Sequence, residues 1–351
     1  MKISVIKLRI TGILVLMVIL TVAFFNSTTE AQKKPLKVIL ETDIGNDVDD
    51  AMALDMLNKY ADENKVKLLA VSTNKNSIYS VKYIDIMNTW YGYPSVPIGT
   101  VVNGVNSEGD PANNYTKIAC EFKINNKPVF KSRIKDYNQV MEATQLYRKI
   151  LSAQPDSSVV IISIGFSTNL SRLLNTRADK YSSLTGKELV AKKVKFLSMM
   201  AGNFSKIPAL EYNVMKDIPS AQKVFGEWPT TIVVSPFEVG DSILFPGSVM
   251  ENNFKWAAAD PLVIGYKNYL PMPYDRPTWD NTAVLYAVEK DKNYFTVGKP
   301  GVITVDDSGY TKFTETVMGN RFILSINEKQ KKLVLSRLIN LITKRPKNRD
   351  H

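Results

Sequence analysis

The fold is decided by residues 38–54, VILETDIGNDVDDAMAL. The first three residues form a short apolar run that predicts a buried strand, and apolar residues from Ala51 to Tyr60 recur with helical spacing. Between strand and helix, five carboxylates lie within ten residues. In an open α/β sheet, ligands bind at the carboxyl ends of the strands, where this loop must lie. The stretch therefore predicts an α/β protein with a ligand site in this acidic loop.

Outward from this loop, apolar runs alternate with helical patterns. Strands are expected over residues 67–72, 159–164, 195–200 and 230–234, and helices over 80–92, 140–151, 169–174, 219–225, 331–342 and after Asp280. Residues 97–99 start a short strand or a loop, 103–138 form a long surface excursion, and 301–305 with 321–326 form a hairpin-like end. We expect an α/β fold with a Rossmann-like core, a single domain over 36–345 whose mostly parallel open sheet is flanked by helices.

The composition excludes several kinds of catalytic site. The chain of 351 residues has one histidine, His351, and one cysteine, Cys120. Ser-His-Asp and Cys-His triads, zinc sites built on His or Cys, and non-haem iron triads all need more of these residues. Catalysis must therefore rest on carboxylates, amides, hydroxyls, lysine or a metal bound through oxygen.

The formal net charge is +11. Part of it belongs to the N-terminus and part to a basic tail, residues 346–351 with the lysine and arginine just before it. The other lysines are scattered and form no basic block interleaved with aromatic residues. This distribution argues against nucleic acid as a partner.

The first 32 residues have the pattern of a secretory signal peptide. Lys2, Lys7 and Arg9 precede the apolar run 10–25, and a short polar stretch follows. Cleavage after residue 31 or 32 would leave no stable membrane insertion, whereas an uncleaved segment would be an anchor. Both alternatives place the domain outside the cytoplasm, in the periplasm or secreted.

The acidic loop itself predicts a metal or sugar site. So many neighbouring carboxylates stay ionised together only if a cation or strong donors compensate them. Gly45 allows a sharp turn, and oxygen ligands without His or Cys suit Ca²⁺ or Mg²⁺. An EF-hand is excluded because the loop lacks the glycine and the glutamate that an EF-hand carries at loop positions 6 and 12. In the simpler alternative, Asp49 and Asp50 only cap the helix and favour its dipole, and Asp43 is a solvated loop residue.

The loop resembles the N-terminal signature of the nucleoside hydrolase family of inosine–uridine type, Asp-x-Asp-x-Gly-x-Asp-Asp followed by Ala-x-Ala-Leu. Glu41 stands in place of the first Asp, and two further residues lie between Gly45 and the Asp49-Asp50 pair. This longer form of the motif is similar to that of a divergent, exported bacterial branch of the family.

Three later segments agree with the same resemblance. Residues 161–170 (IISIGFSTNL) resemble a strand end whose backbone carbonyl, here that of Ile164, ligates calcium. Residues 199–221 resemble the Met-Gly-Gly, Glu-Phe-Asn and Asp-Pro-Glu-Ala run, which implies ribose contacts for Glu211 and Asn213 and a further one for Asn203. Residues 276–283 resemble the His-Asp segment, with Asp280 as the remote calcium ligand. Trp279 stands where many members carry a histidine that protonates the leaving base, and it either stacks on the base or belongs to the core.

The resemblance implies a calcium-dependent hydrolase of the N-glycosidic bond of ribonucleosides or a related N-riboside. It implies Ca²⁺ ligation by Asp43, Asp50, Asp280 and Ile164, with Asp43 also the general base on a metal-bound water. It implies substrate contacts by Asp49, Asn203, Glu211, Asn213 and Trp279. The alternatives are a calcium-dependent nucleoside- or sugar-binding protein without turnover, and a hydrolase of a different glycoside. The expected partner is a small nucleoside or riboside, and a homo-oligomer is left open.

Overall fold

The computed structural model describes residues 34–105, 114–257 and 259–347. From Pro35 onward these residues belong to one compact unit. The expected signal peptide over 1–32 and most of the basic tail lie outside the described residues. Within the described ranges, none of the helices combines the length and apolar character needed to cross a bilayer.

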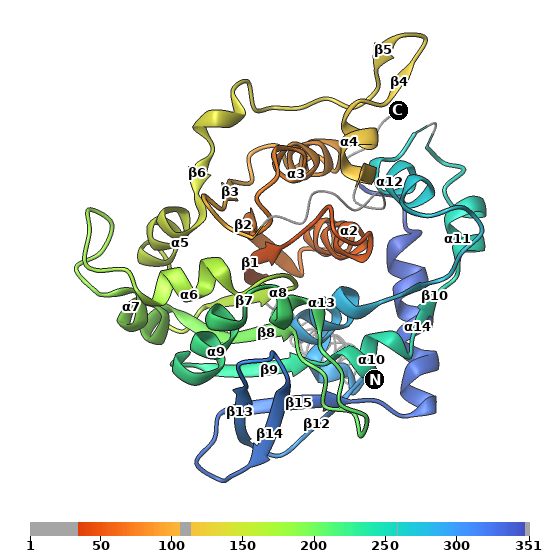
Figure 1. Cartoon of the computed structure of the whole chain (residues 1–351). Helices are drawn as coiled ribbons and strands as arrows, with labels where there is room; N and C mark the ends of the chain where they lie inside the picture. The colour runs from red at the N-terminus through yellow and green to blue at the C-terminus, as the bar shows by residue number, and fades with distance from the viewer. Residues whose placement is uncertain (1–33, 106–113, 258, 348–351) are drawn as a thin grey trace, which may run out of the picture. The chain divides into compact units, whose positions relative to one another are not determined.

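A mixed sheet of 11 strands runs through the described part of the chain. In order across the sheet, the strands are β14 (Thr311–Glu315), β13 (Gly301–Val305), β15 (Arg321–Ser325), β9 (Thr231–Ser235), β8 (Val194–Met200), β7 (Val159–Ser163), β1 (Leu36–Thr42), β2 (Val66–Thr73), β3 (Ile98–Thr100) and β6 (Met141–Glu142), and β12 (Thr296–Val297) pairs with β15. Every neighbouring pair from β15 to β6 is parallel, and the pairs made by β12, β13 and β14 are antiparallel. The predicted α/β class with a mostly parallel sheet is confirmed (Figure 1).

Helices cover both faces of the sheet, and because successive strand residues point to opposite sides, each strand contributes to two cores. In β1, Val38 and Leu40 join one hydrophobic core and Ile39 joins the other. The first core includes residues of α2 (Asp49–Asp62), α3 (Ile78–Trp90), α4 (Tyr115–Cys120), α10 (Phe237–Asp241), α11 (Gly247–Asn252), α12 (Pro261–Tyr269), α13 (Trp279–Glu289) and α14 (Glu328–Ile342). The second includes residues of α5 (Ala143–Ser152), α6 (Thr168–Leu174), α7 (Gly186–Lys193), α8 (Tyr212–Lys216) and α9 (Ile218–Glu227).

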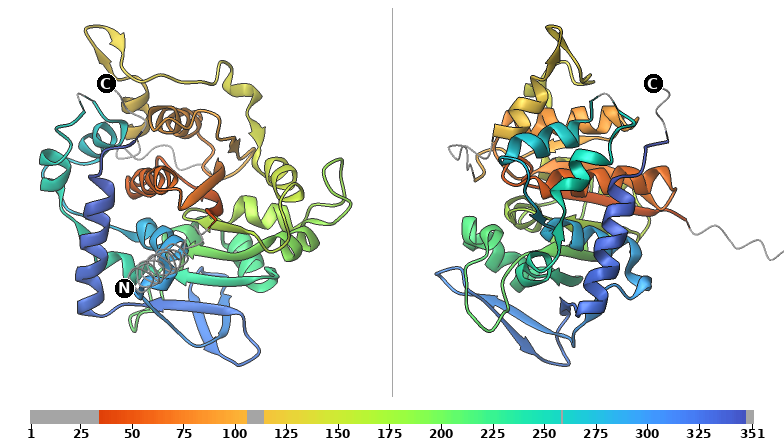
Figure 2. Two further views of the ribbon diagram at one scale, coloured as in Figure 1. Left: turned by 180° about the vertical axis from the view of Figure 1, so that it is seen from behind. Right: turned by 90° about the vertical axis from the view of Figure 1, so that its right-hand side faces the viewer.

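Helix α2, which begins with Asp49 and Asp50, is enclosed by its neighbours. It packs against α3, α12, α13 and α14, and Figure 2 shows α14 along the outside of the molecule. Lys59 of α2 is almost fully buried, forms an ion pair with Asp55 at 2.8 Å and donates to the carbonyl of Ile342. The helix that presents the two aspartates is therefore held along its length.

The direction of strand addition reverses beside β1. The chain proceeds from β1 to β2 and β3 on one side and continues through β7, β8 and β9 on the other. At such a reversal the loops leaving the adjacent strands diverge and open a crevice at the carboxyl ends. Asp43 follows β1 and Ile164 follows β7, so both lie at this crevice.

The C-terminal strands differ from the expected hairpin-like end. Residues 301–305 form a hairpin with β14, a strand that the sequence did not indicate, and they meet β15 at one pair, Gly301 and Arg321. Strand β15 instead extends the main sheet in parallel with β9. Residues Arg321–Ile323 pair with residues 232–234, which lie about 90 positions earlier in the sequence. Short-range sequence patterns do not indicate which distant strand a segment will pair with.

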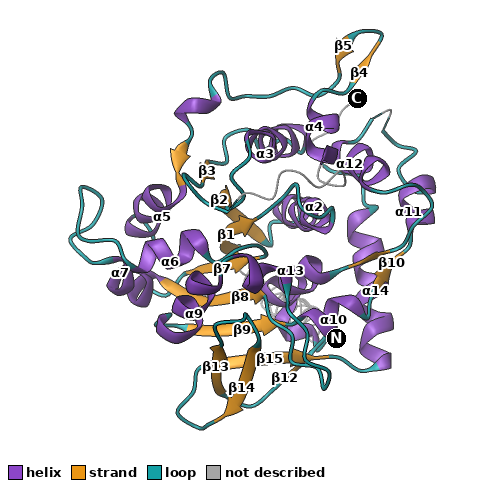
Figure 3. Ribbon diagram, viewed as in Figure 1, coloured by secondary structure: helices purple, strands orange, loops and turns teal. Residues whose placement is uncertain are grey.

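The described part of the predicted surface excursion is mostly exposed and irregular (Figure 3). It contains α4, the small hairpin of β4 (Lys123–Ile124) and β5 (Lys127–Pro128), and the 3-10 turn η2 (Tyr137–Gln139). A second small pairing joins β10 (Leu244–Phe245) to β11 (Arg276–Pro277), and a further 3-10 turn, η3 (Lys290–Lys292), follows α13. Within the excursion, Tyr115 is completely buried and its hydroxyl reaches the acidic loop.

A buried polar network joins the ends of β1, β2 and β7. The Asn74 side-chain amide donates to Glu41 Oε2 at 2.8 Å and to the Phe166 carbonyl at 2.8 Å, and its oxygen accepts from Phe166 N–H at 3.1 Å. Glu41 is fully buried and also accepts from Tyr147 and Asn169. Burial raises the pKa of Glu41 to about 8 despite these hydrogen bonds. Glu41 thus supports the loops beneath the crevice.

The Asn74→Ala substitution removes all three hydrogen bonds and leaves a buried carboxyl group short of a donor. We expect it to lower the free energy of unfolding by about 2–4 kcal/mol, measured by urea denaturation. Asn138→Ala, at an exposed position, is the control and should change little. Equal effects of the two substitutions would contradict this role for Asn74.

Candidate active site

A pocket of about 310 Å³ opens at the carboxyl ends of the parallel strands. Its walls come from the loop after β1, the turn after β7, the end of β8 and the segment after it, the starts of α2, α8, α10 and α13, and the end of α12. The lining residues are Asp43, Asn46, Asp47, Asp49, Asp50, Ile164, Met200, Leu210, Glu211, Tyr212, Asn213, Phe237, Tyr269, Trp279 and Asp280. The structure therefore brings together every site residue expected from the sequence except Asn203.

Three carboxylates converge at the floor of the pocket. Asp49, Asp50 and Asp280 each offer an oxygen atom within 4.8 Å of the others, and all three side chains are buried. Asp280 comes from α13, more than 200 residues along the chain, and its backbone N–H donates to Asp49 Oδ2 at 3.0 Å. A group of buried carboxylates at this spacing is a candidate site for a hard cation with oxygen ligands.

The N-terminus of α2 tests the simpler alternative, in which Asp49 and Asp50 only cap the helix. Val48 is the N-cap residue and makes no side-chain capping hydrogen bond, while Asp49 and Asp50 occupy the first turn. Asp47 Oδ1 instead accepts from Val48 N–H at 2.6 Å. The helix dipole favours both carboxylates at this position. Their side chains nevertheless line the pocket, so a capping role alone does not account for them.

Asp43 lies beside the three-carboxylate group. Its Oδ2 accepts from the side-chain amide of Asn46 at 2.7 Å. Across the crevice, Gly165 approaches so closely that a Cβ atom there would lie 2.6 Å from Asp43 N and 2.7 Å from Asp43 Oδ1. A side chain at position 165 would therefore displace Asp43, which explains the glycine directly after Ile164.

Burial keeps the carboxyl groups of the pocket away from water and raises their pKa values. Burial raises the pKa of Asp43 to about 6 and those of Asp49 and Glu211 to about 7. Burial, and then the neighbouring carboxylates, raise the pKa values of Asp50 and Asp280 well above the ordinary range. Strongly perturbed carboxyl groups gathered in one crevice are typical of a functional site.

Two residues that the sequence did not single out hold the acidic loop in place. Lys75 is 1% exposed, donates to the Gly45 carbonyl at 2.9 Å, and its charge lowers the pKa values of Asp43 and Asp50. The Tyr115 hydroxyl accepts from Gly45 N–H at 3.0 Å and donates to the Asp47 carbonyl at 2.7 Å. A lysine and a tyrosine in polar stretches carry no local signal of such contacts, because their partners lie tens of residues away.

The opposite side of the pocket carries Glu211 and Asn213. The Glu211 carboxylate accepts from the backbone N–H groups of Gly202 at 2.9 Å, Asn213 at 2.8 Å and Val214 at 3.1 Å, which caps α8 and fixes the side chain. The Asn213 amide lies 3.4 Å from the carbonyl oxygen of Ile164. A fixed carboxylate beside an amide offers acceptors and donors for the hydroxyl groups of a sugar.

Aromatic residues form the remaining wall. Trp279 lines the pocket and stacks on Phe237, with ring centroids 5.4 Å apart and planes inclined by 27°. Gly240 of α10 permits this arrangement, because a Cβ atom there would lie 2.3 Å from the Trp279 Cα. Trp279 is therefore packed against its neighbours and also lines the pocket, so both alternatives that the sequence left open, stacking on a base and a place in the core, remain predictions.

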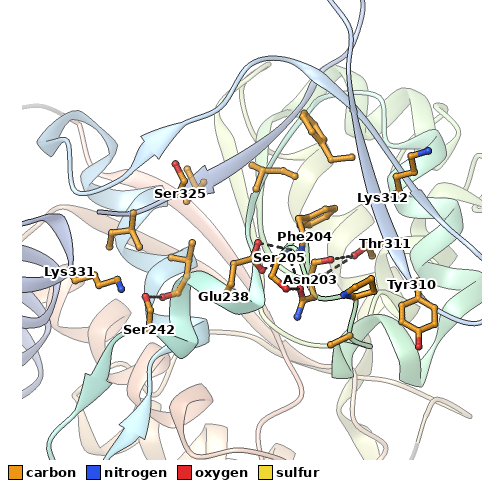
Figure 4. Close-up of a pocket in the computed structure, with 17 residues that line it drawn as sticks. Asn203, Phe204, Ser205, Glu238, Ser242, Tyr310, Thr311, Lys312, Ser325 and Lys331 are labelled. Carbon is orange, nitrogen blue, oxygen red and sulfur yellow. Dashed lines mark hydrogen bonds between the residues drawn. The ribbon is translucent and has the colours of Figure 1, made fainter. Parts of the chain in front are cut away.

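Asn203 lies elsewhere. It lines a separate pocket of about 900 Å³ between the segment after β8 and the C-terminal hairpin (Figure 4). Its side-chain oxygen accepts from Ser205 N–H at 3.0 Å and from the Ser205 hydroxyl at 2.7 Å, and its backbone exchanges hydrogen bonds with Thr311. These contacts assign Asn203 to the turn that follows β8, outside the walls of the carboxylate pocket.

Comparisons with known proteins agree with this geometry. The family model described as inosine-uridine preferring nucleoside hydrolase matches residues 38–334. No curated protein matches the chain.

Among solved structures, a plant nucleoside hydrolase shares the fold with a TM-score of 0.68 at 18% identity, covering 89% of this chain and 100% of its own. The inosine-uridine preferring nucleoside hydrolase from Bacillus anthracis gives 0.64 at 18% identity, covering 87% and 99%. The purine-preferring ribonucleoside hydrolase from Gardnerella vaginalis gives 0.64 at 16% identity, covering 88% and 99%. At these identities the solved structures establish the fold.

The raised pKa values predict a pH-dependent response to calcium. Because these carboxyl groups bind protons more tightly when folded, their contribution to stability is full below about pH 4 and is lost as pH rises through about 7. A bound cation replaces the protons, so CaCl₂ should raise the Tm more at pH 8 than at pH 5. At about 100 times its Kd the ion adds about 2.7 kcal/mol, a shift of several degrees.

Thermal melts at both pH values, with CaCl₂ or with a chelator, measure this response. Asp280→Asn should remove most of it, and Asp306→Asn, at an exposed turn, should retain it. A calcium shift of equal size at the two pH values, or none at either, would contradict the assignment of the carboxylate group to a cation.

Proposed function

The chain belongs to the inosine-uridine preferring nucleoside hydrolase family, and on this premise we propose that it hydrolyses the N-glycosidic bond of ribonucleosides or a related N-riboside, with calcium as cofactor. The observation that carries the proposal is the meeting of Asp43, Asp49, Asp50 and Asp280 with Glu211 and Asn213 in one pocket. This pocket combines a candidate cation site, a general base and a sugar-binding side.

The donor set fits a calcium ion. Among the described residues, the polar groups that line the pocket are carboxylates, amides and tyrosine hydroxyls, with Ile164, Met200 and Leu210 as apolar members and without an imidazole or a thiol. We assign the ligands to the carboxylates of Asp43, Asp50 and Asp280 and to the carbonyl oxygen of Ile164, with Asp49 close enough to join them. When bound, the ion supplies Lewis-acid polarisation of a water molecule and of the sugar hydroxyls.

Asp43 is proposed as the general base. Burial raises the pKa of Asp43 to about 6 when no cation is bound, and a cation beside it would favour the ionised carboxylate that accepts a proton. The hydrogen bond from Asn46 and the close approach of Gly165 fix its orientation. As the water oxygen bonds to the anomeric carbon, its proton passes to Asp43, and the electrons of the breaking C–N bond leave with the base.

The sugar side of the pocket stabilises the charge that develops on the ribose. Glycoside hydrolysis passes through an oxocarbenium-like state with positive charge at the ring. Asp49, Glu211 and Asn213 are proposed to hold the hydroxyl groups. The carboxylates of Asp49 and Glu211 would stabilise the positive charge, because they are close to it in a site of low dielectric. The backbone hydrogen bonds of Glu211 keep its carboxylate in position while the charge forms.

Trp279 supports an alternative function, that of a binding protein without turnover. It occupies the place of a histidine that protonates the base in the family pattern, and an indole N–H does not serve as a general acid at neutral pH. A calcium-dependent nucleoside- or sugar-binding protein without turnover would show the same pocket. Within the hydrolase proposal, Trp279 and Phe237 form a stacking surface for the base. A hydrolase of a different glycoside is the further alternative, and a substrate panel separates it.

The site of action is proposed to be outside the cytoplasm. The charge and apolar pattern of residues 1–32 supports export to the periplasm or beyond. Calcium is generally more available there than inside the cell, in agreement with the proposed cofactor.

Asp43→Asn should lower kcat for nucleoside hydrolysis by about 10³-fold or more, since it removes the base and an anionic ligand together. Removing one of several mutually repelling carboxylates should leave the Tm without calcium unchanged or slightly higher. Release of reducing sugar from inosine and uridine measures the activity, with Asp306→Asn as the control. Full activity in Asp43→Asn would contradict the mechanism.

Ribose release from a panel of purine and pyrimidine nucleosides, with CaCl₂ or with a chelator, tests the function itself. Calcium-dependent release is the expected result. Absence of release together with calcium-dependent protection by ribose or nucleosides against melting would favour the binding protein.

A further inference from the structure

Arg276 makes an unusual set of contacts at the rim of the pocket. Its Nε donates to Asp47 Oδ1 at 2.9 Å, and its Nη2 donates to Asp47 Oδ2 and, at 3.2 Å, to the Tyr269 hydroxyl. Its guanidinium also lies over the ring of Tyr269 at 5.0 Å and over the ring of Trp279 at 5.1 Å. One side chain therefore contacts three residues that line the pocket.

These three residues belong to different walls. Asp47 lies in the acidic loop, two residues before Asp49, in the stretch between Gly45 and Asp49 that is two residues longer than in the family signature. Tyr269 and Trp279 belong to the aromatic wall. Tyr115 adds a parallel connection, because its hydroxyl donates to the Asp47 carbonyl and its ring packs edge-on against Tyr269 at 5.7 Å. The rim thus joins the metal-binding side to the base-binding side.

The backbone of Arg276 is fixed independently of its side chain. In the β10–β11 pairing, Arg276 is opposite Phe245, which is fully buried. Two residues later, Thr278 N–H donates to the Gly240 carbonyl at 3.2 Å and its hydroxyl donates to the Ile243 carbonyl at 3.0 Å. A change of the side chain should therefore loosen the rim while the strand stays in place.

We propose that Arg276 is a positioning residue that ties Asp47 to Tyr269 and Trp279, and thereby determines which leaving groups the site expels. The inference rests on the proposed function. Lysine cannot replace it, because the bidentate contact to Asp47 and the stacking on two rings both require the planar guanidinium fork.

The chemistry of the leaving group explains why this position affects selectivity. A purine or pyrimidine is a poor leaving group unless the pocket stabilises it as it departs, and the described residues that line this pocket include no imidazole to protonate it. 4-Nitrophenolate is stable in water and departs without such help. Loss of the aromatic alignment should therefore penalise nucleosides much more than a nitrophenyl riboside with the same sugar.

The test compares hydrolysis of inosine, uridine and 4-nitrophenyl β-D-ribofuranoside by the wild type, Arg276→Gln, Arg276→Lys and Asp47→Asn at saturating CaCl₂. We expect all three variants to lose about 100-fold in kcat/KM on the nucleosides and about threefold or less on the nitrophenyl riboside, as a misplaced wall would produce. Calorimetric binding supplies a second readout, in which Arg276→Gln should weaken inosine binding and leave ribose binding unchanged.

Arg337→Gln is the matched control. Arg337 also makes a bidentate ion pair, with Glu289 at 2.7 and 3.1 Å, and lies over the ring of Tyr60 at 5.5 Å, but it does not line the pocket. Its substitution should leave the ratio of the two activities unchanged.

Equal losses on both substrate classes, no loss on either, or the same selective loss in Arg337→Gln would overturn the inference. A wild type that hydrolyses none of the three ribosides contradicts the proposed function instead. The binding comparison then decides the role of Arg276, and equal effects on inosine and ribose, or binding of neither, would overturn it.

Discussion

The cost of holding four carboxylates together away from water is the constraint on which the rest of the structure depends. Asp43, Asp49, Asp50 and Asp280 all line one pocket, and burial raises the pKa of each. Such a group is unfavourable in a folded chain unless a cation compensates it or the surrounding structure resists its repulsion. The protein provides resistance through the enclosed helix α2, the buried Lys75 and the tyrosine that holds the acidic loop at two backbone groups. The strain is thus concentrated where a cation would relieve it.

Sheet topology explains why these groups meet. Strand addition reverses beside β1, so the segments after β1 and β7 border one crevice. The start of α13 then brings Asp280 over the first turn of α2, where its backbone N–H contacts Asp49. Two glycines make the close approaches possible, Gly165 against Asp43 and Gly240 against Trp279. The pocket is consequently a product of the whole sheet rather than of any one loop.

The two sides of the pocket have different physical tasks. In the proposed reaction, the carboxylate side meets positive charge, on a cation and on the sugar ring. The aromatic side is proposed to meet a flat base, and because the described lining of the pocket includes no imidazole, the departure of that base would rely on stacking and alignment. The ion pair of Arg276 with Asp47 lies between these sides, where the proposed positioning role of Arg276 would couple the placement of one to the placement of the other.

The sequence by itself determined what short-range patterns encode. Periodicity predicted β1, α2, the buried β7 and the parallel α/β class, and the crowding of acidic residues in 41–50 indicated a cation or sugar site. The resemblance to family segments located Glu211, Asn213 and Asp280. Only the tertiary structure decided the rest. In the folded chain, β15 pairs with β9, and Asn203 lines a pocket other than the one expected from the sequence. The fold also brings Tyr115, Lys75 and Arg276 to the acidic loop. Arg276 and Asp47 are 229 residues apart, and their contact depends on how the sheet and helices pack, which local patterns do not record.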